Sequence, residues 1–319
     1  MKKIYYGKAV YDSKEINAVN KVLKNNSLSL VDGTNVKILE SKVCKIFGKK
    51  YGLMVNSGSS ANLLALASFN FKKDSEIITP NLTFSTTVAP IYQLGLKPYF
   101  IGVEKNKFVA DPLQIKKCIN KKTVAIMIPN LIGNIANWKV INSIAKKYNL
   151  KVIEDSADTI GYTFNNKNTG KFSDVTTNSF YASHIINGAG TGGIVCFNDF
   201  KLYQRAQLLR GWGRSSANFK ESEHINKRFN VKISNIDYDR KYIFSELGYN
   251  FLPSEVSAAF AIEQIKKLKN NIKIRIGNFK YLKVFFNKYD DLLDLPEQYP
   301  GVKTPWLAFP LVRKKNKYF

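Results

Sequence analysis

One histidine stands where it could take part in chemistry. The chain has 319 residues but only two histidines, and His184 ends the stretch SFYASH at 179–184, just before a glycine-rich run at 187–193. This pattern predicts a short strand that breaks into a flexible turn, followed by a second strand at 194–197. Imidazole can gain and lose a proton near neutral pH, so His184 is a candidate acid–base group. A plain surface loop between two strands would show the same pattern, and this stretch alone leaves both interpretations open.

Three further polar clusters follow predicted strands. Residues 56–62, NSGSSAN, could cradle a phosphate at a helix N-terminus, or could simply cap that helix. Phe84, within 83–87, could stack on a planar ring, whereas core packing is the commoner role of phenylalanine. The carboxylates of EDSAD at 154–158 follow an apolar pair, and Asp155 could either keep a pyridine nitrogen protonated or cap a helix.

The elements that carry these clusters alternate between strand and helix. Such alternation predicts an α/β protein with a mostly parallel sheet covered by helices on both faces. In that architecture ligands gather at the carboxyl ends of the strands, which is where the polar clusters stand. Strands are predicted at 52–56, 76–79, 98–103, 124–128 and 151–154, and helices at 14–24, 36–47, 60–69, 86–94, from 111, 138–148 and 200–209.

The last third of the chain is less regular. Residues 210–249 are polar and rich in Asn and Ser, which predicts a long excursion with little regular structure. Ser254 can cap a long helical stretch that runs, with or without a break, to about residue 289. From the length we expect a large domain, 1–253, and the start of a small C-terminal domain, 254–319.

Composition narrows the class of protein. The formal net charge is +25, but the lysines sit in scattered pairs without a nucleic-acid-binding motif, so we interpret the charge as compositional and expect no nucleic-acid partner. It would still attract an anionic substrate. Three widely separated cysteines predict neither a disulfide framework nor a metal site, and Cys44 and Cys196 are expected in the core. The absence of an apolar segment of about 18 residues predicts a cytoplasmic protein without a membrane span.

Taken together, the clusters supply a phosphate cradle, a ring stacker, a pyridinium partner and an acid–base group. The chain resembles the DegT/DnrJ/StrS family of sugar aminotransferases, within the fold type I pyridoxal-phosphate (PLP) enzymes, from about residue 16 to the end. Five motifs carry the resemblance in the same order: GSSAN at Gly58, PxxTFSxT at Pro80, EDSAD at Glu154, SFYxxH at Ser179 and LGYN at Leu247.

The resemblance implies roles for individual residues. Phe84 would cover one face of the cofactor ring, and Asp155 would pair with its nitrogen. Asp158 stands where many members have Gln near the ring hydroxyl. Asn250 would reach the phosphate of the neighbouring subunit, since members are homodimers with shared sites. The phosphate itself would be held by Gly58, Ser59, Ser60 and Ser179.

His184 departs from the family pattern, because most members have there the lysine that anchors the cofactor covalently. The nearest lysines, Lys171 and Lys201, lie outside the motif. With a histidine at this position, the chain resembles one branch of the family, the 3-dehydrases of 4-keto-6-deoxy nucleotide sugars. By that resemblance the cofactor works as pyridoxamine phosphate (PMP), its amine condenses with the C4 ketone, and His184 removes a proton so that the C3 hydroxyl leaves.

The branch contains two types, one using an iron–sulfur cluster with a reductase and the other using glutamate. The cluster type places cysteines in the loop equivalent to 214–237, and this chain has none there, so we expect no cluster. The flanking sequence nevertheless looks more like the cluster type, which leaves the reductant open. Family chains usually continue beyond the equivalent of Phe319, so the small domain is expected to be incomplete.

The leading hypothesis is therefore a PLP/PMP enzyme that removes a hydroxyl group from a nucleotide-linked sugar for surface polysaccharide or deoxysugar synthesis. The alternatives are a sugar aminotransferase, a non-catalytic member that senses cofactor or sugar, and, last, a nucleic-acid binder.

Overall fold

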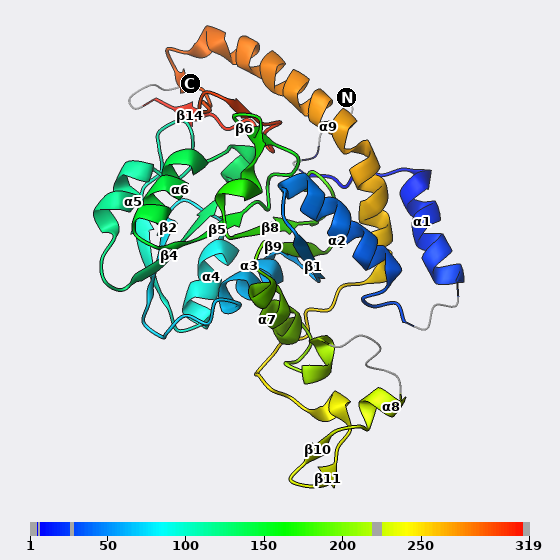
Figure 1. Ribbon diagram of the computed structural model, residues 1–319. Helices are drawn as coiled ribbons and strands as arrows, with labels where there is room; N and C mark the ends of the chain where they lie inside the picture. The colour runs from blue at the N-terminus through cyan, green and yellow to red at the C-terminus, as the bar shows by residue number, and fades with distance from the viewer. Residues whose placement is uncertain (1–4, 6, 26–28, 219–224, 315–319) are drawn as a thin grey trace.

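The computed structural model describes residues 5, 7–25, 29–218 and 225–314, and its centre is a seven-stranded sheet (Figure 1). The strand order is β1-β9-β8-β5-β4-β2-β3. All neighbours from β8 to β3 are parallel, whereas β9 runs antiparallel to both β1 and β8. The predicted mostly parallel α/β sheet is confirmed. The strands are β1 (Tyr51–Val55), β2 (Glu76–Pro80), β3 (Lys97–Ile101), β4 (Thr123–Pro129), β5 (Lys151–Asp155), β8 (Val175–Ser179) and β9 (Gly193–Phe197).

Both faces of the sheet are buried, because successive side chains of a strand point to opposite faces. Leu53 and Ile153 pack with one helical layer, while Met54 and Val152 pack on the other side. The first layer contains α3 (Gly58–Ala67), α4 (Ser85–Gln93) and α7 (Phe200–Arg210). The second contains α2 (Thr34–Phe47), α5 (Pro112–Cys118), α6 (Trp138–Lys147) and the start of α9 (Glu255–Phe286), against which α1 (Ser13–Lys24) packs.

Helix ends follow the capping residues of the sequence. Asp12 caps α1 in a capping box with Glu15, and Gly48 ends α2 in the left-handed conformation with φ +70°. α9 is a single unbroken helix of 32 residues, which Ser254 caps through the N–H of Val256. No proline interrupts it, so the break that the sequence allowed does not occur.

Two stretches differ in detail from expectation. The strand predicted to begin at Ser179 in fact ends there. The N–H of the next residue, Phe180, bonds to the carbonyl of Gly192, just before β9. The helix after β1 begins at Gly58 rather than at residue 60, since Ser57 is its N-cap.

The described residues of the stretch 210–249 form the predicted excursion, which extends away from the sheet (Figure 1). Where described, it holds only short elements: η3 (Ser215–Asn218), α8 (Ile225–Arg228), β10 (Lys232–Ile233), β11 (Ile236–Asp237) and η4 (Arg240–Tyr242).

The remaining elements are short as well. They are η1 (Leu131–Gly133), β6 (Thr163–Phe164), β7 (Lys167–Asn168), η2 (Thr169–Phe172), η5 (Asn287–Tyr289), β12 (Leu293–Asp294), β13 (Val302–Lys303) and β14 (Val312–Arg313). β13 pairs with β6, and Ala258 of α9 lies in the core with α2, so the second predicted domain is packed onto the first; the division at residue 253 stays a prediction. Cys44 and Cys196 are buried free thiols, as expected. In the described part of the chain, no helix is long and apolar enough to cross a membrane.

Candidate active site

A cavity of about 760 Å³ opens at the carboxyl ends of the parallel strands. The segments that follow β1, β2, β4, β5 and β8 all contribute to its lining. The four polar clusters singled out in the sequence therefore meet in one place, as the rule for doubly wound sheets predicts. Seven of the nine predicted site residues line this cavity: Gly58, Ser59, Phe84, Asp155, Asp158, Ser179 and His184.

One end of the cavity is the N-terminus of α3. The Ser57 hydroxyl accepts the N–H of Ser60 at 3.0 Å, which leaves the N–H groups of the first turn directed at the cavity. Gly58 lies so close to Ser179 that an added Cβ would be 2.5 Å from the Cβ of that serine. Ser60 does not line the cavity, because its hydroxyl is turned to Ser57 at 3.0 Å. The arrangement can hold an anion with backbone N–H groups and the helix dipole.

The carboxylate of Asp155 lies on the floor of the cavity and is only 4% exposed. Its Oδ2 accepts hydrogen bonds from Asn62 Nδ2 and Thr87 Oγ1, both at 2.8 Å, and its Oδ1 accepts the N–H of Ala157 at 3.0 Å. A carboxylate offers about four lone-pair positions, so room for a further donor remains. Asn62 and Thr87 were not identified from the sequence, although both stand in the quoted motifs; Asn62 lies one helical turn after Gly58, on the same side of α3.

The imidazole of His184 lies beside a second carboxylate. Its Nε2 is 3.7 Å from Oδ1 of Asp158, and both side chains are about one-fifth exposed. Oδ2 of Asp158 accepts the N–H of Ile132 at 2.8 Å, which fixes the carboxylate. The other ring nitrogen of His184, Nδ1, is buried and has no hydrogen-bond partner among the described residues.

Burial raises the pKa of Asp158 above its ordinary value, and the nearby Asp155 carboxylate acts in the same direction. The N–H of Ile132 and the charge of His184 oppose this effect only in part. The cavity thus holds two acidic groups in different environments, one next to an imidazole, which is an arrangement suited to moving a proton.

Phe84 is 68% exposed and lines the cavity as the N-cap residue of α4, so core packing is not its role here. The segment 307–308 and the turn at 131–132 also line the cavity. These were missed by sequence reasoning, because no polar group or motif marks them.

Comparison with known proteins agrees with this geometry. The profile of the DegT/DnrJ/EryC1/StrS aminotransferase family matches residues 10–317. The chain belongs to this family. It is 35% identical to a GDP-4-keto-6-deoxy-D-mannose 3-dehydratase of Escherichia coli O55:H7 over 97% of this chain and 78% of that protein. It is also 35% identical to a dTDP-4-dehydro-2,6-dideoxy-D-glucose 3-dehydratase of Saccharopolyspora spinosa, over 89% of this chain but only 63% of that protein's length.

Solved structures place the fold in the same group. A GDP-4-keto-6-deoxymannose-3-dehydratase with a trapped PLP–glutamate geminal diamine superposes with a TM-score of 0.87 at 32% identity, covering 99% of this chain and 80% of that one. A variant of GDP-4-keto-6-deoxymannose-3-dehydratase (ColD), in which a serine and the histidine after it are replaced by asparagine and lysine, has a TM-score of 0.84 at 33% identity over 97% of this chain and 80% of that one. The present chain also has a serine followed by a histidine, at Ser183 and His184.

The described lysines of this chain lie outside the cavity. Among the described residues, neither lysine nor arginine lines the cavity. Lys171 lies beside Gly48, before the start of β1, and Lys201 is an exposed residue in the first turn of α7. Asn250 is exposed, bridges to Gly211 and does not line this cavity; its role toward a second subunit stays a prediction.

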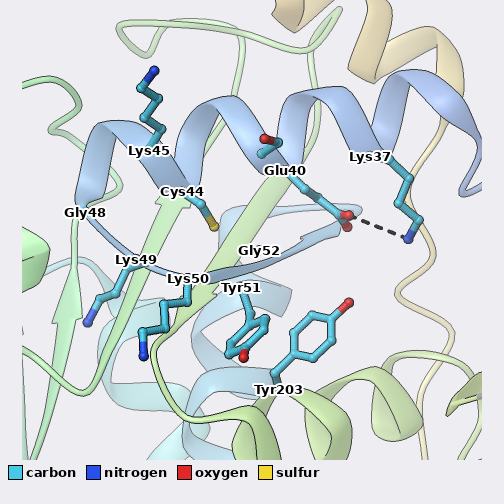
Figure 2. Close-up of a pocket in the computed structure, with 11 residues that line it drawn as sticks. Lys37, Glu40, Cys44, Lys45, Gly48, Lys49, Lys50, Tyr51, Gly52 and Tyr203 are labelled. Atoms are coloured by element: carbon cyan, nitrogen blue, oxygen red, sulfur yellow. Dashed lines mark ion pairs between the residues drawn. The ribbon is translucent and has the colours of Figure 1, made fainter.

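A second hollow of about 570 Å³ lies at the opposite end of β1, between α2 and α7 (Figure 2). Figure 2 shows the amine of Lys37 beside the carboxylate of Glu40, 3.6 Å away, and the rings of Tyr51 and Tyr203 side by side. Lys49 also lines this hollow, and its amine donates hydrogen bonds to the backbone carbonyls of Ser173 and Asp174. None of the predicted site residues reaches this hollow, so the chemistry belongs to the first cavity.

Proposed function

We propose that this chain binds PLP in its amine form, PMP, and removes the C3 hydroxyl of a nucleotide-linked 4-keto-6-deoxy sugar, as a cytoplasmic homodimer in deoxysugar or lipopolysaccharide synthesis. One observation carries the proposal: His184 lines the cavity, and no described lining residue is a lysine. By the resemblance of the SFYxxH motif, His184 would stand where most members of the family have the lysine that anchors the cofactor. The names of the relatives, two of them 3-dehydratases, support the same reaction class.

The residues present fit the cofactor. The first turn of α3 offers backbone N–H groups that would hold a phosphate, and Gly58 packs so closely on Ser179 that a side chain at this position would collide with that serine. Asp155 is fixed by three donors and keeps lone pairs for a protonated ring nitrogen.

When bound, PMP supplies a primary amine for the sugar ketone and a ring that accepts electron density. The residues of the chain would hold this cofactor and transfer the proton. Gly58, Ser59 and Ser179 would hold the phosphate, Phe84 would cover one ring face, and Asp155 would pair with the ring nitrogen. His184 would accept a proton and return it to the departing hydroxyl, while Asp158 keeps the imidazole in place and stabilises its charged form.

Glutamate is the amino donor that we propose. The dehydratase structure with a trapped PLP–glutamate adduct supports this choice, and residues 214–237 contain no cysteine that could hold an iron–sulfur cluster. The overall reaction then balances: glutamate is oxidised to 2-oxoglutarate, ammonia is released, and the sugar loses one oxygen atom.

A second copy of the chain is part of the proposal. The phosphate of the cofactor and the diphosphate of the substrate are anionic, yet the described lining has two carboxylates and no lysine or arginine. A neighbouring subunit would add Asn250 and positive charge to each site. The alternative functions are an aminotransferase and a sensor without turnover. The aminotransferase would work through another lysine, which the described lining lacks, or through proton transfer assisted by His184.

The test is to incubate the purified chain with PLP, glutamate and GDP- or dTDP-linked 4-keto-6-deoxyhexose, and to measure 2-oxoglutarate and the sugar product. We expect 2-oxoglutarate and a deoxygenated sugar from the wild type and neither from His184→Asn. Binding of cofactor and sugar without any product would favour the sensor.

A further inference from the structure

Four apolar residues form one wall of the cavity, next to the His184–Asp158 pair. They come from segments far apart in the sequence, and we call them the apolar wall: Leu131, Ile132, Leu307 and Ala308. None of the four is buried in the core; their side chains are partly or fully accessible from the cavity side. Apolar groups left at a ligand cavity are available to bind an apolar part of the ligand.

The wall depends on an unfavourable backbone conformation. Ile132 has φ +57° and ψ 18°, in the left-handed region that β-branched residues rarely adopt. In this conformation its N–H donates to Asp158 at 2.8 Å and its carbonyl accepts the N–H of Leu307 at 2.8 Å. Strained backbone of this kind persists where the surroundings impose it, and it clusters at functional sites.

The second segment is fixed just as firmly. Gly133, with φ +84°, approaches so closely that an added Cβ would be 2.3 Å from the N atom of Leu307. Thr304 donates to the carbonyl of Gly133, and Arg275 of α9 donates to the carbonyl of Leu307 at 3.3 Å. Trp306 is 2% exposed and stacks on Phe279. The wall is therefore rigid, and Ile132 connects it directly to the acid–base pair.

The position of the wall limits what it can touch. In the proposed function the C4 ketone of the sugar would be placed near His184, so the substituents nearest to the His184–Asp158 pair would be those of C3 and C5. The C3 hydroxyl needs a proton donor when it leaves, which apolar side chains cannot supply. The C5 substituent of a 6-deoxy sugar is a methyl group, and a rigid apolar surface is its natural contact.

We propose that the apolar wall receives the C6 methyl group of the substrate and selects 6-deoxy sugars over their 6-hydroxy counterparts. This inference rests on the proposed function. An apolar pocket discriminates against an added hydroxyl by about 100-fold at most, so we expect a wild-type preference of roughly 10- to 100-fold.

The experiment compares kcat/KM for a nucleoside diphosphate 4-keto-6-deoxyhexose and for its 6-hydroxy counterpart, in the GDP or dTDP series. The variants are Leu307→Ser and Ile132→Asn. Asparagine tolerates a positive φ, so the second variant keeps the backbone of the turn while making the wall polar. Leu311→Ser is the matched control, because Leu311 follows in the same segment but does not line the cavity.

We expect both wall variants to lower the preference for the 6-deoxy sugar by roughly 10-fold, and the control to leave it unchanged. A second readout avoids turnover: calorimetric affinities of the same two sugars for His184→Asn, with and without Leu307→Ser, should show the same loss of discrimination. Active wall variants with the wild-type ratio of the two sugars would overturn the inference. A wild type that deoxygenates neither sugar would instead reject the proposed function, and the inference with it.

Discussion

Nε2 of His184 lies 3.7 Å from Oδ1 of Asp158, while Oδ2 of the same carboxylate accepts the N–H of Ile132 at 2.8 Å. One oxygen is thus tied to the backbone and the other faces the imidazole. A carboxylate in this position can orient the ring and stabilise its protonated form without touching the substrate. In the proposed function, Asp158 would therefore act as a positioning residue for His184.

Replacing Asp158 by Asn keeps an oxygen for the Ile132 N–H but removes the charge beside the imidazole. We expect turnover to fall roughly 10- to 100-fold while PLP still binds. Because burial raises the pKa of Asp158, wild-type activity should drop as the pH falls through that raised value, and the variant should lack this acidic limb. The measurement is the pH profile of kcat for the wild type and for Asp158→Asn. Asp74→Asn, on the exposed surface before β2, is the control and should behave as wild type.

Replacing His184 by Lys should turn the site toward the family's usual chemistry. The new amine can form a Schiff base with PLP, so borohydride should fix the cofactor covalently to the variant and not to the wild type. Mass spectrometry of the reduced proteins measures this, with His184→Asn as the control that has no amine. A reduced adduct on the wild-type protein at any lysine of the site would contradict the proposal and favour the aminotransferase.

Gly58→Ala should weaken cofactor binding at least 10-fold, since the new methyl group would lie 2.5 Å from Ser179 and displace the first turn of α3. PLP titration by absorbance measures the effect. Gly277→Ala is a matched control in α9, where an added Cβ meets no atom within 4 Å. That variant should bind PLP normally and gain about 0.5–1 kcal/mol in unfolding free energy. Equal PLP affinities for the two variants would argue against the phosphate cradle.

Lys49 predicts a pH effect on stability away from the active site. Burial lowers its pKa from 10.5 to about 8, so the folded state loses this proton before the unfolded state does. The unfolding free energy of the wild type, relative to Lys49→Met, should therefore rise with pH between about 8 and 10.5, by up to roughly 3 kcal/mol. Urea unfolding of both proteins at several pH values measures the difference. A constant difference across this range would show that the Lys49 amine is not destabilised by burial.

Much of the site could be predicted from sequence because its residues follow strands directly. Asp155 ends β5 and Ser179 ends β8, so the parallel order of the sheet brings them together without further information. The start of α3 at Gly58 turns the hydroxyl of Ser60 to Ser57, so Gly58 and Ser59 line the cavity and Ser60 does not; its role toward a phosphate stays a prediction.

Other features required the folded structure. The contact between Ile132 and Leu307 joins segments with no motif and no local pattern, and a positive φ at an isoleucine contradicts its intrinsic preference. The pairing of His184 with Asp158 likewise depends on how the turn after β8 folds back, which Gly192 and Phe180 fix through a backbone hydrogen bond. Sequence patterns report local preference and strand order, whereas such contacts are set by tertiary packing.

The most direct test is the mass of the sugar formed by the wild-type protein from a nucleotide-linked 4-keto-6-deoxyhexose in the presence of PLP and glutamate. A histidine-based site whose described lining contains no lysine predicts a product that lacks one oxygen atom and keeps its C4 ketone, formed together with 2-oxoglutarate and abolished in His184→Asn. A product that keeps every hydroxyl group and carries an amino group in place of the ketone would contradict the account.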